Sequence, residues 1–179
     1  MSESYDFTDP EAVVPGAVGR PGQRTFFLQA RQEGLVASFK VEKQQVAALC
    51  EYLSGILADL PPVAGGALPP PTPALEPTSL AWVVGRLAVA YEEADDRIIV
   101  VADEFLELTE EDLETLDVDD PATLLAAGYD PAKARFRLTR EQVAAFIAVG
   151  EDLVRAGRPS CRLCGQPIDP EGHACPRLN

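Results

Sequence analysis

Two segments of the chain share one pattern, in which a short stretch of alternating apolar and polar residues is followed by apolar residues at helical spacing. Alternation at period two is typical of a half-buried strand, and spacing of three and four is typical of a helix with one buried face. Residues 37–41 and 134–138 have the strand pattern, and residues 46–60 and 143–154 have the helical one. Each segment therefore predicts a strand followed by a helix. Thr139 and Gln142 form a capping-box pattern at the start of the second helix.

The two segments also correspond residue by residue. Residues 37–48 align with residues 134–145 without a gap, and half of the aligned positions are identical. Several others, such as Lys40 with Arg137, exchange similar side chains. We interpret this as two copies of one supersecondary unit.

Further strand candidates precede each copy. Residues 24–31 have strand character in the first half, as do 82–91 and 97–102 in the second, and 12–18 is one more candidate. Each half then has three strands and one helix, with short connections and no βαβ crossover. The predicted class is α+β: duplicated β-β-β-α units that form a largely antiparallel sheet covered by two helices.

These patterns give a duplicated α+β domain over residues 1–157, and the cluster of Cys161, Cys164, His173 and Cys175 indicates a zinc-ribbon-like tail over 158–179. The halves of the domain span about 12–60 and 79–157. The tail is expected to add a small zinc knuckle to the fold.

Two segments interrupt the domain. Residues 61–77 are rich in proline, which favours an extended linker, with recognition by an aromatic-lined groove as the alternative. Residues 107–131 are an acidic insertion relative to the first half, with short helices predicted near 109–116 and 121–127.

The formal net charge is −14 at pH 7, and the acidic residues are concentrated in 92–120, where Arg97 is the only basic residue. One interpretation of this segment is a solvated, partly disordered excursion; the other is a docking surface for a basic partner. The negative charge argues against direct nucleic-acid binding.

The tail holds three of the four cysteines and the only histidine of the chain. Cys161 and Cys164 form a Cys-x-x-Cys-Gly turn, and His173 and Cys175 form a His-x-Cys-Pro turn. Four such ligands fill the tetrahedral coordination of zinc, so we predict a structural Zn²⁺ site. The alternatives are free thiols in a disordered tail, a redox Cys-x-x-Cys, another divalent metal, and a three-thiolate site with a mobile histidine.

The sequence contains no recognisable set of catalytic residues. The zinc site uses the only histidine, so no Ser-His or Cys-His pair can form, and no phosphate-loop or dinucleotide motif is present. Arg20 and Arg24 flank a Pro-Gly turn and are candidates for an anion site, with a plain turn as the alternative. Acidic residues within 92–120 could hold Mg²⁺. Cys50 lies on the apolar face of the first helix and is predicted to be buried. We therefore expect that the protein is not an enzyme.

The N-terminus lacks a basic region followed by an apolar run, and no apolar stretch is long enough to span a membrane. We therefore expect a cytoplasmic protein without membrane contact. Thiols stay reduced in that compartment, which favours metal binding over disulfides.

Three strings resemble one family. They are residues 19–31, the helix start at 42–47, and the Cys/His string at 161–176. Together they are similar to the uncharacterised actinobacterial proteins grouped as DUF3090. The resemblance implies a cytoplasmic actinobacterial protein with a zinc-ribbon-like tail, and it implies no activity.

The favoured hypothesis is a non-catalytic, zinc-binding adaptor with a protein partner. One alternative is an enzyme or sensor that binds a phosphorylated small molecule or a nucleotide. A second is a factor associated with the transcription machinery through its zinc ribbon, by analogy of fold. The sequence leaves the oligomeric state open.

Overall fold

The computed structural model describes residues 2–20, 22–61, 72–118, 120–156, 161–165, 168 and 172–177. The strands are β1 (Tyr5–Phe7), β2 (Ala12–Val18), β3 (Thr25–Gln32), β4 (Leu35–Val41), β5 (Val84–Glu92), β6 (Arg97–Glu104) and β7 (Lys133–Leu138). The helices are α1 (Lys43–Asp59), α2 (Glu110–Thr115), α3 (Pro121–Ala126) and α4 (Arg140–Arg155). The predicted α+β class is confirmed.

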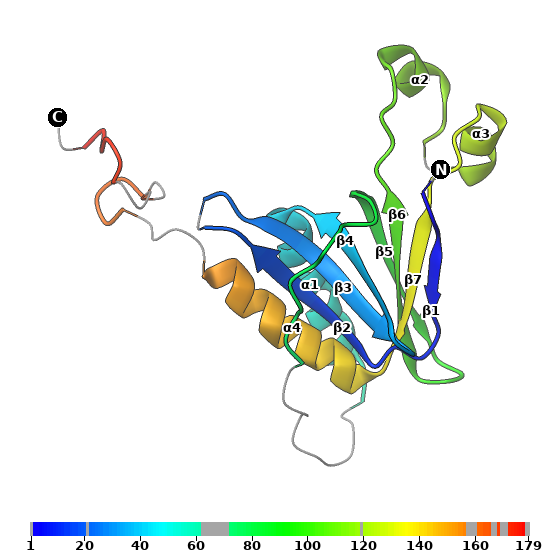
Figure 1. The fold of residues 1–179 in the computed structure, drawn as a ribbon, viewed down its shortest axis with the longest axis horizontal. Coiled ribbons are helices and arrows are strands. Elements are labelled where there is room, and N and C mark those ends of the chain that lie inside the picture. Colours follow the sequence, from blue (N-terminus) through cyan, green and yellow to red (C-terminus); the bar gives the residue numbers. More distant parts are fainter. Residues whose placement is uncertain are drawn as a thin grey trace.

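The strands divide into two sheets, where one was expected. β2, β3 and β4 form an antiparallel sheet in that order, and the other sheet has the order β1-β7-β6-β5. In the second sheet only β1 runs parallel to its neighbour, β7. Figure 1 shows the two sheets at an angle to each other.

A short contact joins the sheets. Lys40 of β4 forms a parallel bridge with Val83, just before β5. The Lys40 backbone N–H donates to the Trp82 carbonyl at 2.9 Å, and the Ala81 N–H donates to the Ser38 carbonyl at 2.8 Å. β4 and β5 do not pair beyond this bridge, so the strands form two separate sheets.

Each half has the predicted order of three antiparallel strands followed by a helix. Phe39 of β4 and Phe136 of β7, which are equivalent in the sequence repeat, meet in the core with ring centroids 5.8 Å apart. A shared order of elements does not by itself establish a duplication, so the duplication stays a prediction.

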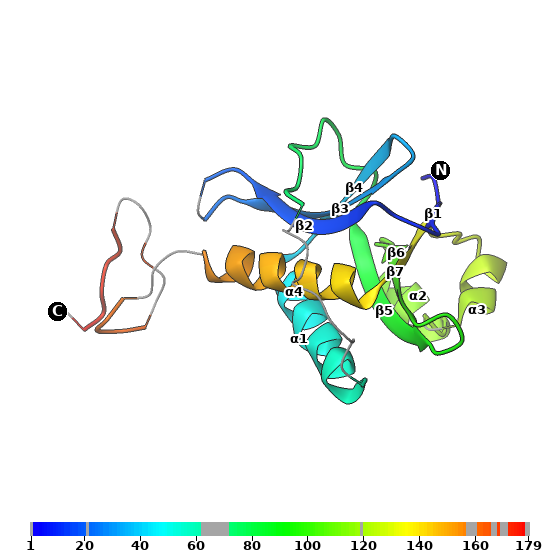
Figure 2. The ribbon, with the colours of Figure 1, turned by 90° about the horizontal axis from the view of Figure 1, so that it is seen from below.

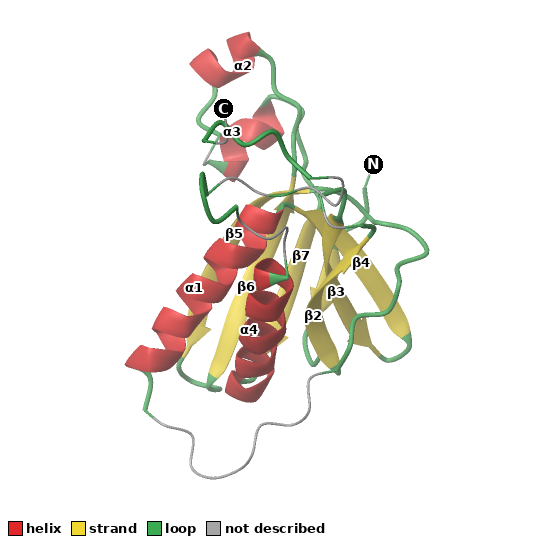
Figure 3. Cartoon of the chain, turned by 90° about the vertical axis from the view of Figure 1, so that its left-hand side faces the viewer, coloured by secondary structure: helices red, strands yellow, loops and turns green. Residues whose placement is uncertain are grey.

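The two long helices pack against each other and against both sheets. Figure 2 shows α1 and α4 beneath the β2-β3-β4 sheet, and Figure 3 shows them in front of the second sheet. Where they cross, a Cβ atom at Gly150 of α4 would lie 2.4 Å from the Cys50 sulfur of α1. Cys50 is buried, as predicted, and burial raises the pKa of its thiol to about 11.

Equivalent glutamines fasten the starts of these helices. Gln45 and Gln142 each occupy the third helical position of a capping box, of which the second, with Thr139, was predicted. The Gln45 side chain also donates to the Val84 carbonyl at 3.2 Å, and the Gln142 side chain donates to the Pro10 carbonyl. Each helix start is therefore tied to a strand of the other half or to the segment leading into β2.

Residues 73–75 of the Pro-rich segment lie against the β2-β3-β4 sheet, whereas residues 62–71 lie outside the described residues. The fully buried side chain of Gln29 donates to the Leu75 carbonyl at 3.0 Å and accepts from the Leu75 N–H at 2.9 Å. Arg31 donates to the Pro73 carbonyl. A Cβ at Gly16 would lie 2.8 Å from Ala74, so glycine permits this close approach.

The acidic segment is largely built into the fold. Its residues 97–104 form β6, a central strand with Ile98 and Ala102 fully buried, so a partly disordered excursion is the wrong interpretation there. The predicted short helices are present as α2 and α3, capped by Thr109 and Asp120. Within the described residues, no helix combines the length and apolar character needed to cross a membrane.

Candidate functional site

The tail brings the four predicted ligands together. The ligand atoms of Cys161, Cys164, His173 and Cys175 all lie within 4.8 Å of one another. The Cys161 and Cys175 sulfurs are 3.9 Å apart, and the Cys164 sulfur is 3.2 Å from His173 Nε2. No other group of three or more Cys, His, Asp or Glu ligands was found among the described residues.

The first turn is shaped to present its thiols. The Gly165 N–H donates to the Cys161 carbonyl at 2.9 Å, and Gly165 has a φ of 75°, a conformation that glycine adopts without strain. Backbone N–H groups of Cys164 and Leu163 donate to the Cys161 sulfur and lower the pKa of its thiol. The turn therefore favours the thiolate, the form that binds metal.

The second turn closes over the first. Arg177, which follows the His-x-Cys-Pro turn, donates to the Leu163 carbonyl at 2.9 Å. The outer two cysteines, Cys161 and Cys175, are only 9% and 7% exposed. The two turns thus face each other with Cys161 and Cys175 shielded from solvent and Cys164 half-buried.

The separations suit a tetrahedral ion. Zn–S bonds of about 2.3 Å at tetrahedral angles place two sulfurs about 3.8 Å apart, and a sulfur and a nitrogen about 3.6 Å apart. The observed sulfur–sulfur distance of 3.9 Å lies close to the first value, and the sulfur–nitrogen distance of 3.2 Å is somewhat shorter than the second. The four residues could hold a metal ion, and four protein ligands would leave a tetrahedral ion no open position for water or substrate.

The two arginines proposed for an anion site do not act as a matched pair. Arg24 donates from Nη1 to the Ala156 carbonyl at 2.9 Å, at the C-terminal end of α4. A cation in that position stabilises the negative end of the helix dipole. Arg20 is exposed, and its carbonyl accepts from the Gln23 N–H at 2.9 Å within the turn. Arg24 is therefore engaged in the fold.

Several of the acidic residues considered for Mg²⁺ take part in ion pairs or helix caps. Arg137 pairs with Glu92 and Asp95, and Arg140 pairs with Asp96. Asp96 also accepts from the Tyr91 hydroxyl, and this bond and the one from Arg140 lower the pKa of its carboxyl group. The described residues bring no three of these acids together as a ligand group.

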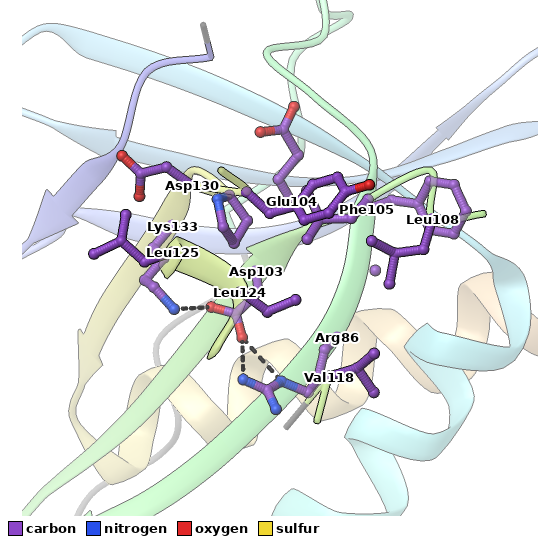
Figure 4. Close-up of a pocket in the computed structure, with 14 residues that line it drawn as sticks. Arg86, Asp103, Glu104, Phe105, Leu108, Val118, Leu124, Leu125, Asp130 and Lys133 are labelled. Atoms are coloured by element: carbon purple, nitrogen blue, oxygen red, sulfur yellow. Dashed lines mark hydrogen bonds and ion pairs between the residues drawn. The ribbon is translucent and has the colours of Figure 1, made fainter. Parts of the chain in front are cut away.

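A pocket of about 360 Å³ lies between one end of the second sheet and the acidic insertion (Figure 4). It was not predicted. Its lining comes from the start of β5, from the end of β6 and the residues after it, and from the approach to β7. The signal in the sequence is the set of apolar residues interspersed among acidic residues between the end of β6 and the start of β7, a set that the net charge of this stretch does not reveal. These are Phe105, Leu106, Leu108, Val118, Leu124 and Leu125.

Three charged side chains form the inner end of this pocket. Arg86, Asp103 and Lys133 lie side by side on β5, β6 and β7. The Asp103 carboxylate accepts from Arg86 Nε and from Lys133 Nζ, both at 2.9 Å. Burial alone would raise the pKa of this carboxyl group, but the two cations outweigh burial and lower it. Asp103 therefore stays ionised at neutral pH and links side chains of three adjacent strands.

Comparison with known proteins identifies the family. A family described as "Protein of unknown function (DUF3090)" matches residues 5–175. No curated protein and no solved structure matches the chain. The match covers both sheets, α1 and α4, the acidic insertion and all four ligands of the tail. The chain therefore belongs to the DUF3090 family.

Proposed function

We propose that this protein is a non-catalytic adaptor of the cytoplasm whose tail binds one structural Zn²⁺ and which acts by binding a protein partner. The observation that carries the metal assignment is the convergence of three sulfurs and one imidazole nitrogen within 4.8 Å. Thiolate and imidazole donors in tetrahedral array favour zinc over the hard, oxygen-seeking cations.

The closed donor set supports a structural role. Catalytic zinc sites keep a position for water or substrate beside three protein ligands, whereas structural sites use four. Zinc would tie the two turns of the tail, which are otherwise joined by contacts such as that of Arg177 with Leu163. Such a tail is a small rigid body beyond the end of α4, on the opposite side of the molecule from α2 and α3 (Figure 1).

The partner-binding part of the proposal is supported by the distribution of charge and apolar surface. Phe105, which follows β6, and Leu125 of the acidic insertion are exposed beside carboxylates, a combination suited to protein contact. The alternative of an anion-binding enzyme is weakened because Arg24, one of its two candidate contacts, binds the end of α4.

Metal analysis tests the first part. The full chain, purified without chelators, is expected to carry about one equivalent of zinc. Zinc below about half an equivalent, with no other metal in its place, would contradict the assignment.

Affinity capture combined with an activity assay tests whether the protein acts by binding a partner. Wild-type protein, used as bait under native conditions, should retain a partner protein in stoichiometric amount. In a separate assay, the purified protein should not turn over phosphate esters or nucleotides. Recovery of the protein alone, together with saturable turnover of such a compound that survives repurification, would replace the adaptor by an enzyme.

A further inference from the structure

The outer wall of the pocket is apolar and open to solvent. Phe105, Val118 and Leu125, which all line it, are 56%, 39% and 62% exposed. Other large exposed apolar side chains of the described residues, such as Leu35 of the β3–β4 hairpin and Leu163 of the tail, lie away from it. Exposed apolar side chains gathered on one concave surface are typical of an interaction site.

The inner end of the pocket does not favour an anion. Arg86 and Lys133 share the Asp103 carboxylate between them, and Glu104 and Asp130 also line the pocket. The acidic lining residues therefore outnumber the basic ones. A phosphate or carboxylate entering here would meet carboxylates as well as cations, and it would have to compete with Asp103 for both cations.

The surroundings of the pocket are acidic. Residues 105–131 contain no lysine, arginine or histidine. Glu107, Glu110 and Glu114 are exposed within this insertion, and Asp130 is exposed in the lining itself. Figure 4 shows Asp130 and Glu104 above Asp103, with Phe105 beside Glu104. A bound segment would thus find an apolar cavity surrounded by negative charge.

We propose that the pocket docks a basic segment of a partner protein, which inserts one apolar side chain between Phe105, Val118 and Leu125 while its lysines and arginines face the acidic insertion. The charge complementarity selects this occupant, since a second copy of a chain with net charge −14 would be repelled. The inference rests on the proposed function, because it names the chemistry of the partner that an adaptor would bind.

The experiment uses the full-length zinc-loaded protein and fluorescein-labelled peptides, each with a central Leu, Phe, Tyr or Trp flanked by arginine and lysine. Fluorescence anisotropy measures the dissociation constant. At least one peptide should bind, and replacing its central residue by serine should weaken binding by about tenfold. A matching peptide with glutamate in place of the basic residues should not bind.

Variants of the protein locate the site. Leu125→Ser should weaken binding of the selected peptide by about tenfold, because it removes an exposed part of the apolar wall. Leu35→Ser is the matched control, since Leu35 is 50% exposed and lies outside the pocket. It should leave binding unchanged. Thermal unfolding of both variants checks that each remains folded. Phe105→Ser removes a second apolar side chain from the same wall and should also weaken binding.

Charge variants test the other half of the recognition. The double substitution Glu107→Gln with Glu114→Gln should weaken binding by about threefold at low salt, and about 0.5 M NaCl should abolish that difference. The control is Glu51→Gln with Asp59→Asn, which removes two charges from α1.

Several results would overturn the proposal. These are failure of every peptide to bind, equal binding when the central residue is serine, or equal binding to Leu125→Ser and wild type. Dimerisation that Leu125→Ser abolishes would identify a second copy as the occupant instead. A Cys161→Ser variant should still bind the peptide, so loss of the zinc site and loss of docking are separate outcomes.

Discussion

The metal ligands come from one short segment, residues 161–175, whereas the pocket is assembled from β5, from the end of β6 with the insertion after it, and from the approach to β7. In the tail, residue type and spacing largely define the site. The pocket, by contrast, cannot be recognised from residue type and spacing. It depends on the strand pairing that places Arg86 and Lys133 on either side of Asp103. The two regions should therefore respond independently to substitution, and the following experiments test that independence.

The largest effect is expected from removing one metal ligand. Cys161→Ser should lower the zinc content from about one equivalent to near zero, because a structural zinc site owes its affinity to the complete ligand set. Unfolding of the two-sheet body should be unchanged. Cys50→Ala is the matched control: it removes the one cysteine outside the tail and should retain the zinc. Elemental analysis and thermal unfolding measure both, and retained zinc in Cys161→Ser would contradict the assignment.

Within the body, the largest loss of stability is expected at Gln29. Gln29→Leu leaves the Leu75 backbone groups and the Ser38 hydroxyl without their partner, at a cost of about 2–3 kcal/mol. Gln32→Leu removes one exposed bond to the Asp9 N–H and should cost less than about 1 kcal/mol. Urea unfolding compares the two variants; equal losses would show that the buried contact with Leu75 is unimportant.

The helix crossing provides the next test. Gly150→Ala should destabilise by about 1–3 kcal/mol although alanine favours helices, because the added Cβ would lie 2.4 Å from the Cys50 sulfur. Adding Cys50→Ala removes that sulfur and should recover most of the loss. A double variant no more stable than Gly150→Ala, measured by urea unfolding, would mean that this contact does not limit the approach of α1 and α4.

The smallest effect is expected at the inner end of the pocket. Asp103→Asn should cost about 1 kcal/mol at neutral pH, since Arg86 and Lys133 lose a shared partner but are themselves nearly half exposed. Asp6→Asn, which removes an exposed ion pair with Arg135, should cost less.

The pH dependence of this variant has a defined sign. Because the folded state lowers the Asp103 pKa, its contribution is fully present above the unfolded pKa of about 4 and is lost as the pH falls through the lower folded value. The stability difference between wild type and Asp103→Asn should therefore shrink in acid. A difference that grows as the pH falls would contradict the lowered pKa.

Much of the fold follows from local patterns. The strand candidates, two of them with a period-two pattern, and the helical spacing of residues such as Val46 and Val143 predicted β2 to β7, α1 and α4 close to their observed bounds. The Thr139–Gln142 capping box was also predicted. These features depend on near neighbours in sequence, which is why one chain is enough to find them.

The rest depends on contacts between distant segments. β1 has only three residues and gains its strand partner from β7 at the far end of the domain, so no local pattern could predict it. The division into two sheets arises because β4 and β5 do not pair beyond the single Lys40–Val83 bridge. The metal ligands were identified because both turns are contiguous, and the pocket was missed because its apolar wall is hidden in an acidic stretch.

X-ray absorption at the zinc edge of the wild-type protein tests the central claim most directly. It reports the identity, number and distance of the atoms bound to the metal. We expect one zinc per chain with three sulfurs at about 2.3 Å and one nitrogen at about 2.0 Å, and no bound water. An oxygen ligand in place of a sulfur or of the imidazole, or the absence of stoichiometric zinc, would contradict a closed site built from Cys161, Cys164, His173 and Cys175.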